Sequence, residues 1–300
     1  MSNKSKKNRN QKSNKTNVIK IILGSLCSIL LIMTILLVSK PELLYRVQGV
    51  LLGRKDQYVS LKGKNYSKTN LQSFDLNSQT EWRSEQSLIL LNKTHALPEG
   101  FEPQMAEYKD SGVQMNVAML DAYAQLSAAV TENTGDKMYV SSVYRSVEEQ
   151  AEIQANDPEI ALPPGHSEHH TGLAVDVYVF EHAGMNFLES EAGQYVNKNC
   201  YDFGFIIRYP EDKEEITGIT FEPWHLRYVG LPHSKIIQQK FITFEEYIDL
   251  LKPNKFYRYN NYLITRQPLN SQIVLPAGLQ NIIYSPDNTG HVIVTGQVND

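Results

Sequence analysis

The stretch GHSEHHTGLAVDV, residues 165–177, decides the fold of this chain. Its first half follows two prolines and is rich in Gly, Ser and His, so it predicts a loop, whereas residues 173–180 are apolar enough to predict a strand. His169 and Asp176 lie seven residues apart across this junction. Gly172 between them would let the loop turn sharply and bring the two side chains together.

A second stretch, FEPWHLRY at 221–228, places His225 three residues after Glu222. With His169 and Asp176, His225 would complete a normal zinc ligand set that keeps a fourth position for water, and Glu222 is the candidate base for that water. Spacing alone fits ordinary hydrogen-bonded histidines as well. On a regular strand Glu222 and His225 would face opposite sides, so we expect Pro223 to mark an edge or a bulge.

Around these two stretches, apolar spacing and capping signals predict short helices and strands in alternation. We expect helices over 116–131, from Ser146 through Ile153, across about 188–200 and from Thr243 to about Leu251. We expect strands at 88–91, Met138–Val143, 173–180, Phe205–Arg208 and Ile219–Tyr228. This arrangement favours an α+β fold with a small antiparallel sheet over a doubly wound parallel one.

The N-terminus is strongly basic and is followed by an apolar segment. Residues 1–40 contain eight Lys and Arg and no Asp or Glu, so with a total net charge of −4 the rest of the chain carries −12. The apolar run ends at Val38 and is about 20 residues long, which is enough to cross a membrane. We expect an uncleaved anchor with a cytoplasmic N-terminus and all residues after Lys40 outside, in preference to a cleaved signal peptide or a buried core helix.

The acidic body argues against nucleic-acid binding, which depends on clustered Lys and Arg. The two cysteines cannot pair, because Cys27 lies inside the apolar segment and Cys200 is alone in the remainder. No disulfide framework is therefore expected, and Cys200 is best interpreted as a small buried hydrophobe.

The stretches SVYRSVEEQ, GHSEHHTGLAVDV and RYPEDKEEITGITFEPWHLRYVGLPHS resemble the VanY-type D-alanyl-D-alanine carboxypeptidases of the zinc M15B peptidase family. The family pattern S-x-H-x-x-G-x-A-x-D is met by Ser167, His169, Gly172, Ala174 and Asp176. A second pattern, E-x-W-H, is met by Glu222, Trp224 and His225. The similarity extends roughly from residue 85 to the C-terminus.

The resemblance implies an M15/hedgehog-like peptidase fold with a role for each matching residue. His169, Asp176 and His225 would hold one zinc ion, and Glu222 would be the general base. Arg145 would lie near the scissile carbonyl or the terminal carboxylate of the substrate, as both a catalytic and a binding residue. The polar residues that would assist at this carboxylate are Gln150 and Ser167.

The domain organisation that follows has five parts. They are a basic cytoplasmic tail (1–17), a transmembrane anchor (18–39), an extracytoplasmic linker (40–85), a zinc carboxypeptidase domain (86–252) and a small β-rich extension (253–300). In the extension, Asn-Asn and Asp-Asn-Thr-Gly turns predict two strand pairs. About 48 residues are too few for an independent fold, so we expect the extension to pack on the main domain.

The implied reaction is hydrolysis of the C-terminal D-Ala from peptidoglycan stems that end in D-Ala-D-Ala, with a contribution to glycopeptide (vancomycin) resistance. An alternative is an L,D-carboxypeptidase that trims tetrapeptide stems, which related M15B enzymes cut. A third, different class is an inactive wall-binding module, against which the complete set of four site residues argues. A dipeptidase for free D-Ala-D-Ala fits less well, since that substrate is cytoplasmic and this domain is expected outside.

Overall fold

A computed structural model describes residues 28, 63–64, 71–156 and 161–298 of the chain. Apart from Ser28, the tail and the anchor expected at 1–39 lie outside the described residues. Within the described part of the chain, no helix has both the length and the apolar composition needed to cross a membrane. From residue 63 onward, the described residues belong to the unit Val59–Asp300.

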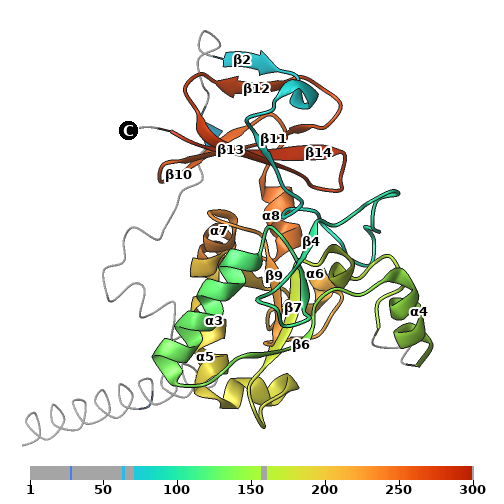
Figure 1. The fold of residues 1–300 in the computed structure, drawn as a ribbon. Helices are drawn as coiled ribbons and strands as arrows, with labels where there is room; N and C mark the ends of the chain where they lie inside the picture. Colours follow the sequence, from blue (N-terminus) through green and yellow to red (C-terminus); the bar gives the residue numbers. More distant parts are fainter. Residues whose placement is uncertain (1–27, 29–62, 65–70, 157–160, 299–300) are drawn as a thin grey trace, which may run out of the picture. The chain divides into compact units, whose positions relative to one another are not determined.

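A four-stranded antiparallel sheet supports the main domain (Figure 1). Its strands lie in the spatial order β6 (Tyr139–Ser142), β7 (Ala174–Tyr178), β9 (His225–Tyr228) and β8 (Phe205–Ile207). Every neighbouring pair is antiparallel. The predicted α+β fold with a small antiparallel sheet is therefore confirmed.

The two faces of this sheet differ because side chains alternate along β7. Val175 and Val177 are buried in a core shared with α3 (Leu120–Thr134) and α5 (Glu191–Asn199). Burying each valine contributes roughly 1.5–3 kcal/mol to the free energy of unfolding. Asp176 lies between the two valines and so faces the opposite, polar side of the sheet, where the other candidate site residues gather.

Short helices and turns connect the strands. Both predicted capping boxes are present: the Glu149 N–H donates to Ser146 Oγ at 3.1 Å, and the Glu246 N–H donates to Thr243 Oγ1 at 3.2 Å. The remaining elements of the main domain are β4 (Met105–Glu107), β5 (Gln114–Asn116), α4 (Val147–Asn156), η4 (Glu168–Thr171), η5 (Gly184–Glu189), η6 (Cys200–Phe203), α6 (Glu214–Thr217), α7 (His233–Lys240) and α8 (Phe244–Leu250). Cys200 is buried in the core, as expected.

The last strands form a C-terminal β module, which contains both predicted strand pairs. A six-stranded sheet has the order β1-β10-β11-β14-β13-β3, and β12 pairs with β2 beside it. The strands are β1 (Gly63–Lys64), β2 (Leu71–Phe74), β3 (Arg83–Ser84), β10 (Phe256–Tyr259), β11 (Tyr262–Pro268), β12 (Ile273–Pro276), β13 (Gln280–Pro286) and β14 (His291–Gln297), with η3 (Leu76–Ser78) after β2.

Part of the segment expected to be a linker is folded into this module. β2 and β3 come from residues 71–84, and the side chains of Leu71, Phe74 and Trp82 pack on the apolar cluster of the module. The sequence shows these apolar residues only as isolated positions among polar ones. Their burial depends on partners about 200 positions later in the chain, which a local pattern does not reveal.

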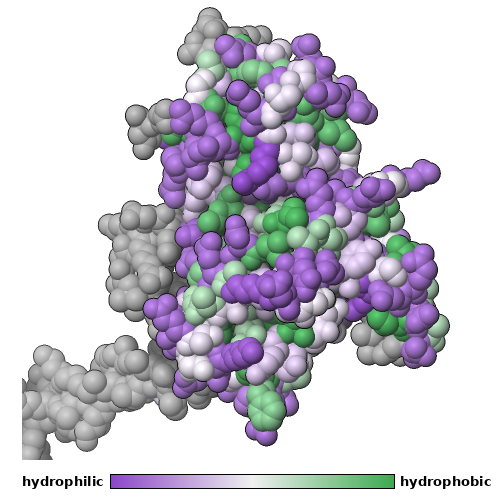
Figure 2. Space-filling view, in the orientation of Figure 1, coloured by the Kyte–Doolittle hydropathy of each residue, from purple (hydrophilic) through white to green (hydrophobic). Residues whose placement is uncertain are grey.

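The C-terminal β module packs on α7 and α8, as predicted for the extension. Phe244 and Tyr247 of α8 share a buried cluster with Ile264 and Ile293 of the module. The Asn288 amide also donates hydrogen bonds to main-chain carbonyls of the main domain, including one of 2.9 Å to the oxygen of Leu90. On the face drawn in Figure 2, hydrophilic residues predominate and hydrophobic ones form small separate groups.

The strand expected at 88–91 is absent, and the segment Ser87–Leu91 is a buried irregular stretch. Its carbonyl oxygens accept hydrogen bonds from two buried guanidinium groups instead of a neighbouring strand. The prediction of a strand was therefore wrong, because long-range side-chain donors satisfy this backbone.

His233 at the start of α7 joins the main domain to the C-terminal β module. Its Nδ1 lies 2.6 Å from the Tyr247 hydroxyl, and its Nε2 lies 3.1 Å from Thr295 Oγ1 of β14. Burial lowers the pKa of His233 to about 3. The imidazole is thus neutral in the folded protein at neutral pH.

We expect His233 to make the protein acid-sensitive. Between pH 6.5, the ordinary histidine pKa, and pH 3 the unfolded chain binds one more proton than the folded chain, so the free energy of unfolding falls as the pH falls, by up to about 1.4 kcal/mol per pH unit. Above pH 6.5 this contribution is constant. Urea unfolding at several pH values should show a shallower slope for His233→Gln. Thr295→Val, which removes the contact but keeps the imidazole, should keep the slope; equal slopes for all three proteins would contradict the assignment.

Candidate metal centre

The fold brings His169, Asp176 and His225 together. Asp176 on β7 and His225 on β9 are register partners in the sheet, so their side chains emerge side by side. His169 lies in η4, which ends at Gly172 in the left-handed conformation with φ of 64°. The three side chains each offer a ligand atom, and all of these atoms lie within 4.8 Å of one another.

His169 is oriented by the main chain that follows β6. Its Nδ1 lies 2.6 Å from the carbonyl oxygen of Val143, so Nδ1 carries the proton and donates it. The other ring nitrogen, Nε2, lies 3.3 Å from Asp176 Oδ2. A histidine ligand usually donates its second nitrogen to a carbonyl or carboxylate in this way, which fixes the tautomer and leaves Nε2 for the metal.

Asp176 and His225 form the second contact of the centre, with 2.8 Å between Oδ1 and Nδ1. Burial lowers the pKa of His225, but the Asp176 carboxylate outweighs it and raises that pKa to about 10. No described residue gives a hydrogen bond of good geometry to Asp176 Oδ1 or His225 Nε2, although both are buried. His169 Nε2 and Asp176 Oδ2, which lie 3.3 Å apart, have about the separation of two ligands on a tetrahedral zinc ion, and two imidazoles with one carboxylate are a normal donor set for zinc.

Glu222 reaches the site through a turn. The His225 N–H donates to the Glu222 carbonyl oxygen at 3.2 Å, which closes a β-turn with Pro223 in the second position, where proline is favoured. The strand therefore starts at His225, and the expected edge or bulge at Pro223 is wrong. Glu222 Oε2 lies 3.7 Å from His225 Nδ1. Burial, together with the Asp176 carboxylate, raises the pKa of Glu222 despite His225.

Arg145 lies beside His169 because their main chains are paired. The Arg145 N–H donates to the His169 carbonyl oxygen at 3.3 Å. Its guanidinium donates to Gln150 Oε1 at 2.7 Å and to Ser142 Oγ at 3.1 Å. The buried Gln150 gives its amide N–H to the Leu162 carbonyl oxygen, so both of its polar ends are engaged within the protein. These contacts orient Arg145.

Two further polar residues of the loop have structural partners. Ser167 is buried and caps η4, where its hydroxyl accepts a hydrogen bond from the His169 N–H at 3.4 Å. His170 uses both ring nitrogens: Nδ1 lies 2.7 Å from the Arg145 carbonyl oxygen, and Nε2 accepts from the Gly165 N–H at 3.0 Å. His170 therefore has no nitrogen left for a metal.

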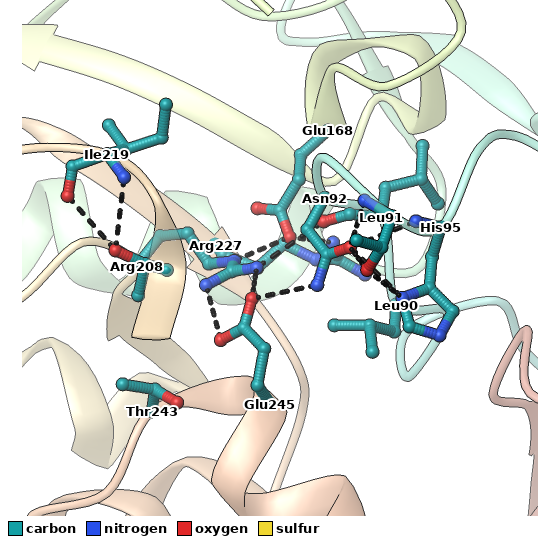
Figure 3. Close-up of polar contacts among 12 residues, drawn as sticks. Leu90, Leu91, Asn92, His95, Glu168, Arg208, Ile219, Arg227, Thr243 and Glu245 are labelled. Carbon is teal, nitrogen blue, oxygen red and sulfur yellow. Dashed lines mark hydrogen bonds and ion pairs between the residues drawn. The ribbon is translucent and has the colours of Figure 1, made fainter. Parts of the chain in front are cut away.

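Sequence reasoning missed a buried charge cluster behind the ligands, drawn in Figure 3. Glu168 lies between Arg208 and Arg227, and all three side chains are fully buried. Burial opposes ionisation of Glu168, but the two guanidiniums outweigh it and hold the pKa of this carboxyl well below its usual range. The sequence did contain a signal for this cluster. Arg208 directly follows the apolar run FII, and Arg227 lies within the strand sequence HLRY, so both arginines occupy positions next to apolar residues.

A family model described as VanY: D-alanyl-D-alanine carboxypeptidase matches residues 112–231 of this chain. A D-alanyl-D-alanine carboxypeptidase of Enterococcus faecium is 37% identical over 199 residues, and the match covers 62% of this chain and 62% of that enzyme. The bifunctional D-Ala-D-Ala dipeptidase and carboxypeptidase VanXYC of Enterococcus gallinarum is 36% identical over 184 residues, which is 55% of this chain and 95% of the relative.

Solved structures show the same similarity. The vancomycin-resistance D,D-dipeptidase VanXYg, in complex with a D-Ala-D-Ala phosphinate analogue, superposes with a TM-score of 0.62 and 27% identity over 71% of this chain and 94% of that one. The LD-carboxypeptidase LdcB superposes with a TM-score of 0.51 and 34% identity over 60% of this chain and 95% of that one.

We expect the purified protein to bind about one zinc ion per chain, because three ligand atoms converge on one point. His169→Ala and Asp176→Ala should each abolish stoichiometric binding, measured by elemental analysis after dialysis. His170→Ala is the matched control, as it removes the neighbouring imidazole whose nitrogens are already engaged. Loss of zinc from the control alone, or retention by both ligand variants, would contradict the assignment.

Proposed function

We propose that this chain, which belongs to the VanY D-alanyl-D-alanine carboxypeptidase family, is a zinc-dependent carboxypeptidase that acts on peptidoglycan. The bond cut is the last peptide bond of stems that end in D-Ala-D-Ala. The observation that carries this proposal is the convergence of His169, Asp176 and His225 on one point, with Glu222 beside them. The fold supplies all four groups on the polar side of one small sheet.

The three ligands would hold the metal through His169 Nε2, His225 Nδ1 and the Asp176 carboxylate. A bound zinc ion supplies Lewis acidity, which polarises the scissile carbonyl and makes water more acidic. Among the residues themselves, Glu222 takes a proton from the attacking water as the oxygen bonds to the carbonyl carbon. Glu222 then passes that proton to the amine as the carbon–nitrogen bond breaks. A carboxyl group with a raised pKa is suited to both transfers.

Arg145 is proposed to bind the terminal carboxylate of the substrate or the developing charge on its carbonyl. The guanidinium is half-buried and is held by Gln150 and Ser142, so little side-chain freedom is lost when it binds a ligand. Gln150 and Ser167 are better explained as supports, because Gln150 orients Arg145 and Ser167 caps the helix of His169.

D,D-cleavage is the preferred activity because the VanXYC and VanXYg relatives act on D-Ala-D-Ala. The similarity to the LD-carboxypeptidase LdcB supports a second candidate, L,D-cleavage of tetrapeptide stems. Loss of the terminal D-Ala would remove the D-Ala-D-Ala end that glycopeptides bind. On this proposal, the protein would contribute to vancomycin resistance.

We expect Glu222→Gln to lower kcat by about 10²–10⁴-fold while zinc content stays the same, because only proton transfer is removed. The assay is D-alanine release from a pentapeptide ending in D-Ala-D-Ala and from a tetrapeptide ending in L-Lys-D-Ala. Glu214→Gln, an exposed carboxylate on α6, is the control and should keep activity. Faster release from the tetrapeptide would favour the L,D activity, and full zinc content without release from either would favour an inactive wall-binding module.

The proposed location is the outer side of a bacterial membrane, with residues 18–39 as the single anchor. Support comes from the basic flank and the apolar run in the sequence. We expect the full chain to be found in the membrane fraction. We also expect external protease to remove a C-terminal tag from the protein in intact spheroplasts. Deletion of residues 1–39 should release the chain from the membrane fraction. A protease-resistant tag, or a soluble full chain, would overturn this topology.

A further inference from the structure

We propose that Glu168 is a positioning residue for the metal centre, whose free carboxylate oxygen accepts the Nε2–H of His225 and so directs His225 Nδ1 to the metal. The inference rests on the proposed function in that it requires a metal at this site. Glu168 directly precedes the ligand His169 in the chain, and on this proposal it acts through His225 without coordinating the metal.

The two oxygens of Glu168 are used differently. Oε1 accepts hydrogen bonds from both Arg208 Nε and Arg227 Nη1, each at 2.7 Å. Oε2 has no hydrogen bond among the described residues and lies 3.8 Å from His225 Nε2, which is also buried without a partner. Two buried polar atoms that face each other are costly unless they pair. A shift of about 0.9 Å would bring them to hydrogen-bond distance.

The charges around Glu168 keep it an acceptor. Arg208 also donates to both oxygens of Glu245, at 3.0 Å and 2.6 Å, so two guanidiniums face two carboxylates and the formal charges cancel (Figure 3). An ionised carboxylate can only accept hydrogen bonds. When a metal takes the Nδ1 lone pair of His225, the remaining ring proton sits on Nε2, the nitrogen that faces Glu168 Oε2 at 3.8 Å. Carboxylate–histidine–metal triads work in this way.

The rest of the cluster is fixed by main-chain carbonyls. Arg227 Nη2 donates to the carbonyl oxygens of Ser87 and Ile89 at 3.2 Å and 2.8 Å, and Arg208 Nη2 donates to that of Leu91 at 3.3 Å. Glu168 is thus held on one side by rigid donors, and only Oε2 is left to face the metal centre. A purely structural role for Glu168 would require the two arginine contacts but not the free oxygen.

The test compares zinc affinity of the full chain with Glu168→Gln and Glu245→Gln, by competition with a chelating dye. Both variants remove one carboxylate charge from the same arginine cluster. In Glu168→Gln, the arginines should take the amide oxygen, so the amide N–H₂ would face the His225 N–H, donor to donor. We expect zinc affinity to fall about 10–100-fold for Glu168→Gln and less than about threefold for Glu245→Gln.

Equal zinc affinity of Glu168→Gln and the unmodified chain would overturn the inference, whereas absence of zinc binding by the unmodified chain would overturn the proposed function itself. If Glu168→Gln fails to fold, NMR of the unmodified chain takes the place of the affinity comparison. In ¹⁵N-histidine NMR of the zinc-loaded protein, His225 should be protonated at Nε2 and bound through Nδ1. Coordination through Nε2 would overturn the inference.

Discussion

The buried ion cluster of Glu168, Arg208 and Arg227 is the interaction on which the rest of the structure depends. Each charge removed from water costs several kcal/mol, and only complete pairing offsets this cost. The protein meets the requirement with a second carboxylate, Glu245, and with the carbonyl oxygens of the segment Ser87–Leu91. That segment is therefore irregular and buried, and the main domain closes around it.

Around this cluster, each site residue is held in place by a different main-chain feature. The β7–β9 register sets Asp176 beside His225, and a proline turn adds Glu222. The Val143 carbonyl sets the ring of His169. Because each of these features uses main-chain groups, the sheet and its turns set the geometry of the centre. The site side chains therefore keep little rotational freedom. Such pre-organisation is what an enzyme needs for charge stabilisation and proton transfer.

Much of this could be predicted from the sequence where the signal is local. The α3 helix and the capping boxes at Ser146 and Thr243 follow from residues close in the chain. The ligand set instead rests on the resemblance of two separate motifs to one family, because spacing alone fits ordinary histidines as well. The missed features depend on distant partners. Residues 88–91 have the sequence pattern of a strand. Their carbonyl oxygens nevertheless accept hydrogen bonds from Arg208 and Arg227, which lie more than 100 positions later in the chain.

The C-terminal β module has a consequence for the order in which the protein becomes functional. The Leu90 N–H donates to the Asp287 carbonyl oxygen at 3.2 Å, and Asn288 donates back to the Leu90 carbonyl oxygen. The segment that completes the arginine cluster is therefore held by Asp287 and Asn288, which follow all three metal ligands in the chain. A nascent chain that has made all its metal ligands still lacks this clamp, so the arginine cluster is completed only after Asp287 and Asn288 have been synthesised.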